Sequence, residues 1–345
     1  MSRRKIQNIL ITGGAGFIGA NTASYYLSKG NKVTLFDNLS RPGVKNNLNW
    51  LKKSFPRSLI NVVIADVKDY TKLKKAVANQ DIIFHFAGQT AVTTSIKNPR
   101  LDFEANALGT FNILEAIREK NPQAIFLYSS TNKVYGDLSR VNTSRRGKRY
   151  YSIESASIDE SEILDFYSPY GCSKGAGDQY THDYARIYGL KTIVFRQSCI
   201  YGAHQFGVED QGWVAHFTAL AIKNKLITIF GDGKQVRDLL YITDLVKACD
   251  KAVKNITTTS GQIYNIGGGI NNSMSLLELI DYLQTLTNKK IKLKFTKARK
   301  GDQKIFISDI DKAQRDFSWS PKVGVKEGIQ KLYQWLFQFF AAQQQ

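Results

Sequence analysis

Long hydrophobic runs are missing from this sequence, and cysteine is scarce. No apolar segment approaches the roughly 18 to 20 residues that cross a bilayer, and the first one, residues 9–11, ends at once in glycines. We therefore expect neither a signal peptide nor a membrane span. Cys172, Cys199 and Cys249 are too few and too widely spaced for a disulfide framework or a zinc site. These absences predict a metal-free protein of the reducing cytoplasm.

Acidic residues are also in short supply relative to basic ones. The chain has 29 Asp and Glu residues against 48 Lys and Arg residues, which gives a formal net charge of +19. Such a surplus attracts polyanions as well as small phosphorylated ligands. However, the basic residues are spread along the chain, and the densest cluster, at 140–149, carries no nucleic-acid-binding motif. We interpret the charge as a solvated surface and expect no nucleic-acid partner.

Apolar strand-like segments alternate with helical segments through the first 200 residues, which predicts an α/β fold with a doubly wound, parallel Rossmann sheet. After residue 198 the pattern becomes irregular and rich in glycine, which is typical of a smaller C-terminal lobe that binds substrate. Residues 139–157 have no clear periodicity and are expected to form a long, partly mobile excursion. The expected strands are 8–12, 32–36, 61–65, 82–86, 124–129 and 191–195, and two of the expected helices are 17–28 and 103–120. The expected dinucleotide-binding domain is 1–197 with about 236–262, and the expected substrate lobe is about 198–235 with 263–340.

A glycine-rich turn, Gly14–Gly19, follows the first strand and opens the first helix, which is the context that a dinucleotide fingerprint requires. Its glycines allow a pyrophosphate to approach the backbone, and the helix start offers free amide groups. Asp37 ends the second strand, where a carboxylate accepts hydrogen bonds from ribose hydroxyls and repels a 2′-phosphate. Arg41 could neutralise such a phosphate, so NADP stays an alternative to the expected NAD. The expected cofactor-binding residues are Gly13, Gly16, Phe17, Ile18, Gly19, Asp37, Asn38, Ser40, Arg41, Asp66, Val67, Phe86, Ala87, Gly88, Gln89, Asn106, Ser129, Tyr170, Lys174 and Gln197.

A tyrosine and a lysine four positions apart provide candidate catalytic groups. Ser168 and Pro169 are a typical cap and first residue of a helix, so Tyr170 and Lys174 share one helix face. A neighbouring ammonium and a positive nicotinamide both favour the phenolate, which makes Tyr170 a credible proton acceptor. Thr131, after the fifth strand, supplies a hydroxyl that can orient a substrate alcohol. An isolated pair of this kind could instead be an ordinary feature of an exposed helix.

With these motifs the chain resembles the extended short-chain dehydrogenases, from about residue 8 to residue 335. The shared motifs are the glycine turn, the Ser129–Gly136 segment and the Tyr170–Lys174 pair. The resemblance implies a nucleotide-linked sugar as substrate. It also implies that Arg237-Asp238, with Arg299, Gly301 and Asp302, hold the nucleotide diphosphate and its ribose.

Dehydratases of this group carry an Asp-Glu pair directly after the catalytic threonine, whereas this chain has Asn132-Lys133. This difference disfavours dehydration and favours a reaction that exchanges only hydride and proton. Segments 40–51, 88–92, 130–136 and 205–213 are similar to those of CDP-paratose 2-epimerases, also called CDP-tyvelose 2-epimerases. The resemblance implies epimerisation at sugar carbon 2 through a 2-keto sugar, a step in lipopolysaccharide O-antigen biosynthesis. The expected substrate-binding residues are Gln89, Thr131, Asn132, Gln205, Arg237, Arg299 and Asp302.

Two other functions stay open at this point. A UDP-hexose 4-epimerase would use the same three catalytic residues, and a non-catalytic NAD-binding regulator would need none of them. Segments 103–120 and 168–188 resemble the two helices by which the group dimerises, so we expect a homodimer or homotetramer, although their apolar residues could instead belong to the core.

Overall fold

The structure is a computed structural model that describes residues 6–343. Its centre is a seven-stranded parallel sheet in the order β12-β8-β5-β4-β1-β2-β3. This is the expected doubly wound topology, because the order reverses direction between β1 and β4. The sheet strands are β1 (Asn8–Thr12), β2 (Lys32–Asp37), β3 (Ile60–Ile64), β4 (Ile82–His85), β5 (Ile125–Thr131), β8 (Lys191–Gln197) and β12 (Gln262–Ile266).

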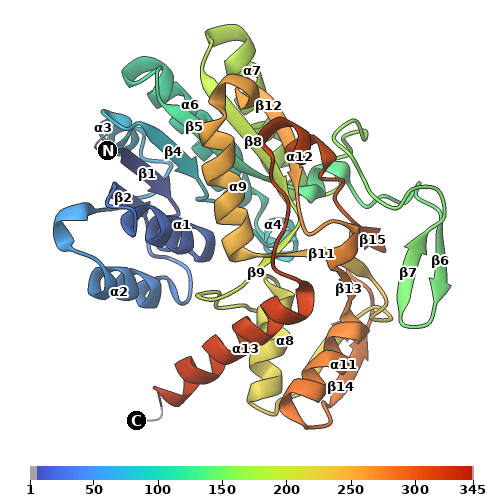
Figure 1. The fold of residues 1–345 in the computed structure, drawn as a ribbon. Coiled ribbons are helices and arrows are strands. Elements are labelled where there is room, and N and C mark those ends of the chain that lie inside the picture. Colours follow the sequence, from blue (N-terminus) through green and yellow to red (C-terminus); the bar gives the residue numbers. More distant parts are fainter. Residues whose placement is uncertain (1–5, 344–345) are drawn as a thin grey trace.

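Helices cover both faces of this sheet and bury two separate apolar clusters (Figure 1). The larger cluster lies under α1, α2 and α9, and it continues into the second lobe. The smaller cluster lies on the opposite face, under α3, α6 and α7. Because both faces are covered, strands such as β4 are buried along their whole length. The helices around the sheet are α1 (Phe17–Leu27), α2 (Val44–Ser54), α3 (Tyr70–Val77), α4 (Val92–Lys97), α5 (Pro99–Phe103), α6 (Gly109–Lys120), α7 (Pro169–Tyr188), α9 (Ile242–Lys254), α10 (Ile256–Thr259) and α12 (Asp311–Phe317).

The second lobe is built from small sheets and three helices that lie beyond the carboxyl ends of the main strands (Figure 1). β11 is its central strand and pairs with β9, β13 and β15, while β10 pairs with β14. β11 thus belongs to this lobe, although its residues were expected in the first domain. The elements of the lobe are β9 (Cys199–Tyr201), α8 (Trp213–Ile222), β10 (Ile227–Phe230), β11 (Val236–Tyr241), β13 (Ser273–Ser275), α11 (Leu276–Thr287), β14 (Leu293–Thr296), β15 (Ile305–Phe306) and α13 (Val325–Ala341).

The segment 139–157 differs from the irregular excursion that we expected. It contains an antiparallel hairpin of β6 (Thr143–Arg146) and β7 (Arg149–Ser152), which extends along the edge of the second lobe (Figure 1). Tyr150 N–H donates to Lys234 O at 3.0 Å, and Ser275 Oγ donates to Lys148 O at 2.8 Å. The hairpin was not predicted from the sequence, because its two short strands are rich in basic residues and show no alternation of apolar and polar residues.

The helix expected at 103–120 is interrupted. Asn98 caps α5, and a π-helical turn at Glu104–Leu108 separates α5 from α6. π-turns are rare and often lie at functional sites. Here the turn carries Asn106, which donates to the backbone oxygen of Gln89, a residue that lines the cleft described below.

Candidate active site

One cleft opens at the carboxyl ends of the main strands, between the two lobes. Its volume is about 560 Å³. Parallel sheets of this kind bind ligands at that edge. The expected residues that line the cleft are Phe17, Ile18, Phe86, Gly88, Gln89, Ser129, Thr131, Asn132, Tyr170, Lys174, Gln197, Arg237, Arg299 and Asp302.

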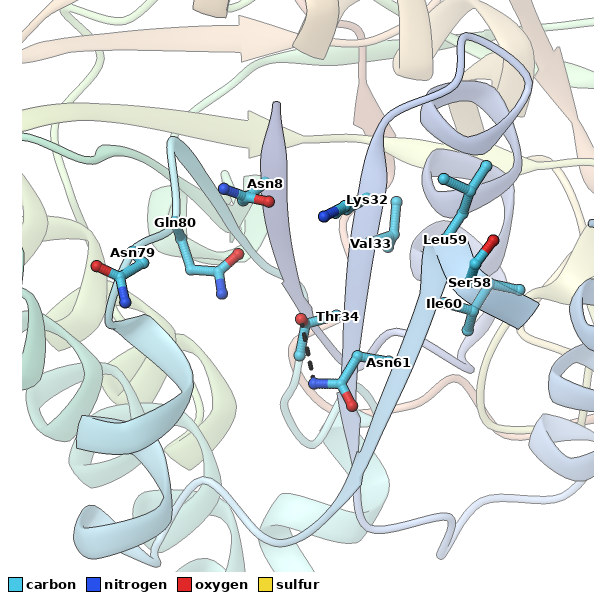
Figure 2. Close-up of a pocket in the computed structure, with 10 residues that line it drawn as sticks. All are labelled: Asn8, Lys32, Val33, Thr34, Ser58, Leu59, Ile60, Asn61, Asn79 and Gln80. Carbon is cyan, nitrogen blue, oxygen red and sulfur yellow. Dashed lines mark hydrogen bonds between the residues drawn. The ribbon is translucent and has the colours of Figure 1, made fainter. Parts of the chain in front are cut away.

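A second hollow, of about 260 Å³, lies at the amino ends of strands β1, β2 and β3 (Figure 2). Lys32 and Thr34 of β2 line it together with residues near the start of β1 and β3, and Asn61 Nδ2 donates to Thr34 Oγ1 at 3.4 Å. It contains none of the expected site residues. The chemistry expected from the sequence therefore belongs to the cleft.

The glycine turn between β1 and α1 leads into Phe17 and Ile18, the first residues of α1, which line the cleft. Gly13 adopts a left-handed conformation (φ +65°), and Gly16 N–H donates to Gly13 O at 3.0 Å. A Cβ on Gly19 would lie 2.1 Å from Gly13 O, so α1 packs onto the turn more closely than any side chain permits. Gly16 caps α1 without a side-chain hydrogen bond, and the first turn contains no acidic residue. This helix start is thus suited to a pyrophosphate, as NAD requires.

Asp37 holds the glycine turn from the end of β2. Its carboxylate accepts hydrogen bonds from Ala15 N at 3.0 Å and Leu39 N at 2.8 Å. Burial raises the Asp37 pKa, and these hydrogen bonds oppose the rise. Arg41 extends across the cleft, where its guanidinium donates to Thr90 Oγ1 at 2.5 Å and Gln211 Oε1 at 3.3 Å. In this conformation Arg41 joins the two walls of the cleft.

The remaining expected cofactor residues fall into two groups. Asp66 accepts hydrogen bonds from Asn38 Nδ2 at 2.9 Å and Lys68 N at 3.0 Å, and Ser40 Oγ donates to Asn38 Oδ1 at 2.7 Å. These three residues thus link the segments that follow β2 and β3, whereas Val67 is buried. Ala87 is in contact with the glycine turn, because its backbone lies within 3 Å of the Cβ position of Gly13. The cofactor roles of these residues stay predictions.

Helix α7 brings the three candidate catalytic residues together. Ser168 Oγ accepts from Gly171 N at 3.1 Å, which is the expected cap. Tyr170 is hydrogen-bonded to the Thr131 side chain. Lys174 Nζ donates to Ser129 O and lies 4.3 Å from the centre of the Tyr128 ring. The tyrosine and lysine therefore lie together at the end of β5.

Burial controls the ionisation of this pair more strongly than their proximity does. It raises the pKa of Tyr170 to about 12, against the opposing hydrogen bond from Thr131. It also lowers the pKa of Lys174 to about 7, although Asp102 and Asp178 oppose this shift. We expected the lysine ammonium and a positive nicotinamide together to favour the phenolate, but Lys174 is not among the groups that lower the Tyr170 pKa here, and the effect of the nicotinamide stays a prediction. A positive charge in the cleft is needed to bring the Tyr170 pKa down.

A buried carboxylate that the sequence analysis missed lies below the cleft. Asp102 is fully buried, and its Oδ1 accepts from Gln89 Nε2 at 2.9 Å and Asn106 Nδ2 at 3.0 Å. Asn106 also donates to Gln89 O at 3.0 Å. These bonds fix the orientation of Gln89 at the cleft surface. The only available signal was the spacing of four between Asp102 and Asn106.

The residues expected to hold the nucleotide lie at the other end of the cleft. Arg237 Nη2 lies 2.6 Å from Asp302 Oδ1, and Arg299 forms an ion pair with Asp210 at 3.2 Å. Asp238 is fully buried and accepts from Gly269 N at 3.2 Å, so it supports the lobe instead of facing a ligand. Gln205 is 2 % exposed and donates to Ile200 O behind the cleft wall. Its substrate role remains untested.

Gln303 connects the loop at the nucleotide end of the cleft to the catalytic end by hydrogen bonds. It is completely buried, its Oε1 accepts from Asn132 Nδ2 at 3.2 Å, and its Nε2 donates to Gly136 O at 2.8 Å. No sequence pattern indicates this contact, because the two segments are 171 residues apart.

Two further observations concern the residues that the structure describes. No helix within 6–343 is long and apolar enough to cross a bilayer. No cluster of three or more His, Cys, Asp or Glu side chains in that part of the chain is arranged to hold a metal ion.

The open parallel sheet, the glycine turn and the Tyr-Lys pair define a short-chain dehydrogenase-like enzyme with a site for a nucleotide-linked substrate. A family model described as GDP-mannose 4,6 dehydratase matches residues 10–332, and the chain belongs to this family. The expected family and fold are thereby confirmed.

Proteins of known name are similar to the chain over nearly its whole length. CDP-paratose 2-epimerase of Salmonella typhi is 48% identical, with 95% of this chain and 98% of that protein covered. A putative UDP-glucose 4-epimerase of Methanocaldococcus jannaschii is 32% identical, with 95% and 98% covered. The structure of UDP-glucuronic acid 4-epimerase from Bacillus cereus, in complex with UDP-glucuronic acid and NAD, superimposes with a TM-score of 0.83 at 27% identity, with 96% and 99% covered. These relatives support the expectation of an NAD-dependent nucleotide-sugar enzyme.

Proposed function

We propose that this protein is an NAD-dependent epimerase that inverts carbon 2 of a CDP-linked deoxyhexose and so interconverts CDP-paratose and CDP-tyvelose. The observation that carries the proposal is that Thr131, Tyr170 and Lys174 line one cleft together with the start of α1, which follows the glycine turn. The near-full-length similarity to a CDP-paratose 2-epimerase supports the choice of substrate.

Each catalytic residue has a role that follows from its position. Thr131 orients the sugar hydroxyl, and Tyr170 removes the hydroxyl proton and later returns it. NAD⁺ held by the glycine turn and Asp37 would supply the acceptor and donor of the carbon-bound hydrogen, together with a positive charge in the cleft. That charge would counter the effect of burial on the Tyr170 pKa. Lys174 Nζ, which donates to Ser129 O, lies beside the same region.

Asn132 supports epimerisation over dehydration. It follows Thr131 directly, and its side chain donates to Gln303 Oε1 at 3.2 Å. An amide in this hydrogen bond is not a general acid at neutral pH, and Lys133 is the next residue. The site thus has no carboxyl group at the two positions where removal of water from the sugar would need one.

The central experiment uses the purified protein without added cofactor. It is incubated in turn with CDP-tyvelose, CDP-paratose and UDP-glucose, and the sugar carbons are followed by NMR. We expect CDP-tyvelose and CDP-paratose to interconvert and UDP-glucose to stay unchanged. Conversion of UDP-glucose alone would instead support a UDP-hexose 4-epimerase, and no conversion of any substrate would support a non-catalytic NAD-binding protein. Tyr151→Phe, at an exposed tyrosine of the hairpin, is a matched control for Tyr170→Phe.

We also propose that the protein acts in the cytoplasm as a homodimer or a tetramer built from such dimers. α6 and α7 expose aromatic side chains next to each other, and the rings of Phe111 and Tyr180 are 5.6 Å apart. Such a face would pair with its own copy about a two-fold axis. Sedimentation equilibrium of the wild type and a Phe111→Asp variant tests this, with a monomeric wild type as the contradicting result.

A further inference from the structure

Two cations share one carboxylate oxygen in the wall of the cleft. Asp302 Oδ1 lies 2.6 Å from Arg237 Nη2 and 3.9 Å from Lys133 Nζ. The Arg237 side chain is 10% exposed and the Lys133 side chain is 19% exposed. Within this group of three, one positive charge has no counterion. A partly buried cation without a counterion is unfavourable unless a ligand supplies the negative charge.

The ammonium of Lys133 also has unused hydrogen-bonding capacity. Within residues 6–343, Nζ has one hydrogen-bond acceptor, the carbonyl oxygen of Gly301 at 3.2 Å. An ammonium carries three donors. Since Lys133 lines the cleft, donors are available to a bound molecule.

The backbone fixes where that molecule would have to lie. Lys133 N–H donates to Thr131 Oγ1 at 3.2 Å, so the lysine follows directly from the residue that faces the reacting sugar. Its side chain reaches the Gly301–Asp302 loop, where Arg237 is also bound. The ammonium therefore lies between the sugar end and the nucleotide end of the cleft.

We infer that Lys133 binds the phosphate that carries the sugar, and that it selects diphosphate-linked substrates together with Arg237. The inference rests on the proposed function, which assigns the cleft to a nucleotide sugar. In a nucleoside diphosphate-sugar, the phosphate attached to the sugar is the group between the two ends. The two negative charges of a diphosphate at this position would compensate the one positive charge of Lys133 and Arg237 that Asp302 leaves without a counterion.

The ionisation of Lys133 gives the inference a second measurable consequence. Burial and the neighbouring Arg237 lower the Lys133 pKa to about 8, while Asp302, Cys199 and Asp137 oppose the shift. Of these groups, the Cys199 thiol does not titrate near pH 8, because burial raises its pKa to about 11. As the pH rises through the Lys133 pKa, the ammonium loses its charge. Affinity for a diphosphate should therefore fall.

The test compares binding of CDP and CMP by isothermal titration calorimetry. The proteins are the wild type, Lys133→Met, Lys133→Arg and a control at an exposed lysine, Lys225→Met. A charge-assisted hydrogen bond contributes about 1.5–3 kcal/mol, so Lys133→Met should weaken CDP binding about tenfold to hundredfold. CMP lacks the second phosphate, and its affinity should change less than about twofold. Lys133→Arg should retain most of the CDP affinity and lose its decline above pH 8.

The outcomes separate this inference from the proposed function. Equal CDP affinity in wild type and Lys133→Met would overturn the inference, and so would an equal loss for CDP and CMP, which indicates a structural role. If the wild type neither binds CDP nor converts CDP-tyvelose, the proposed function itself is wrong. If it does both while Lys133→Met binds CDP normally, only the role of Lys133 fails.

Discussion

A buried ion pair beneath the catalytic helix provides the sharpest test of how the site is supported. Asp178 of α7 is fully buried and Arg196 of β8 is 3% exposed. Asp178 Oδ2 accepts from Arg196 Nε at 2.9 Å and from Ser130 Oγ at 2.7 Å, and Oδ1 accepts from Arg196 Nη2 at 3.0 Å. Arg196 Nη1 also donates to the Tyr135 hydroxyl at 3.1 Å. This network joins the catalytic helix to both strands beside it.

We predict that Asp178→Asn lowers the free energy of unfolding by about 3–5 kcal/mol, because it leaves the guanidinium charge buried without a counterion. Urea unfolding followed by circular dichroism measures the change. The double variant Asp178→Asn with Arg196→Met should lose less than the sum of the two single variants, because neither charge is then left alone. A loss below about 1 kcal/mol in Asp178→Asn, or full additivity in the double variant, would refute this reasoning.

Three more predictions follow from single positions. Gly19→Ala places a Cβ 2.1 Å from Gly13 O, so NAD affinity measured by calorimetry should fall at least about tenfold. The control is Gly324→Ala, where the Cβ meets nothing within 4 Å and NAD binding should be normal. Tyr170→Phe should reduce turnover in the NMR assay about 100-fold or more while NAD content stays unchanged, and full turnover would contradict its role as proton acceptor. Burial lowers the pKa of His85 to about 3 from an ordinary value of 6.5, so the unfolded state binds the extra proton first. The free energy of unfolding should therefore have its full value above pH 6.5 and fall by about 4 kcal/mol toward pH 3. Urea unfolding should show a smaller fall in His85→Gln.

The sequence predicted the elements whose signals are local. A Cβ on Gly16 or Gly19 would meet Gly13 O within the same turn, and Ser168 caps α7 through a bond to Gly171, three residues away. The positions of Asp37 and Thr131 at the ends of strands β2 and β5 also follow from short apolar runs. Such features depend on a few neighbouring residues and can therefore be predicted from the amino-acid sequence.

The contacts that the sequence did not predict depend on residues far apart in the chain. Gln303 joins Asn132 across 171 positions, and Asp102 of α5 accepts from Gln89, which lies outside that helix. The pKa of Tyr170 was anticipated from its charged neighbours, whereas burial, which depends on the whole fold, dominates it. Tertiary packing sets these properties.

The most direct test of the proposed hydride-transfer mechanism is the fate of the hydrogen on carbon 2. CDP-tyvelose deuterated at carbon 2 is incubated with the protein in ordinary water without added cofactor, and the product is analysed by NMR and mass spectrometry. If the hydrogen leaves as hydride and returns within the same cleft, CDP-paratose should keep the deuterium at carbon 2. Replacement of that deuterium by solvent hydrogen would mean that it left as a proton, and would contradict the roles given to Tyr170, Thr131 and the dinucleotide site.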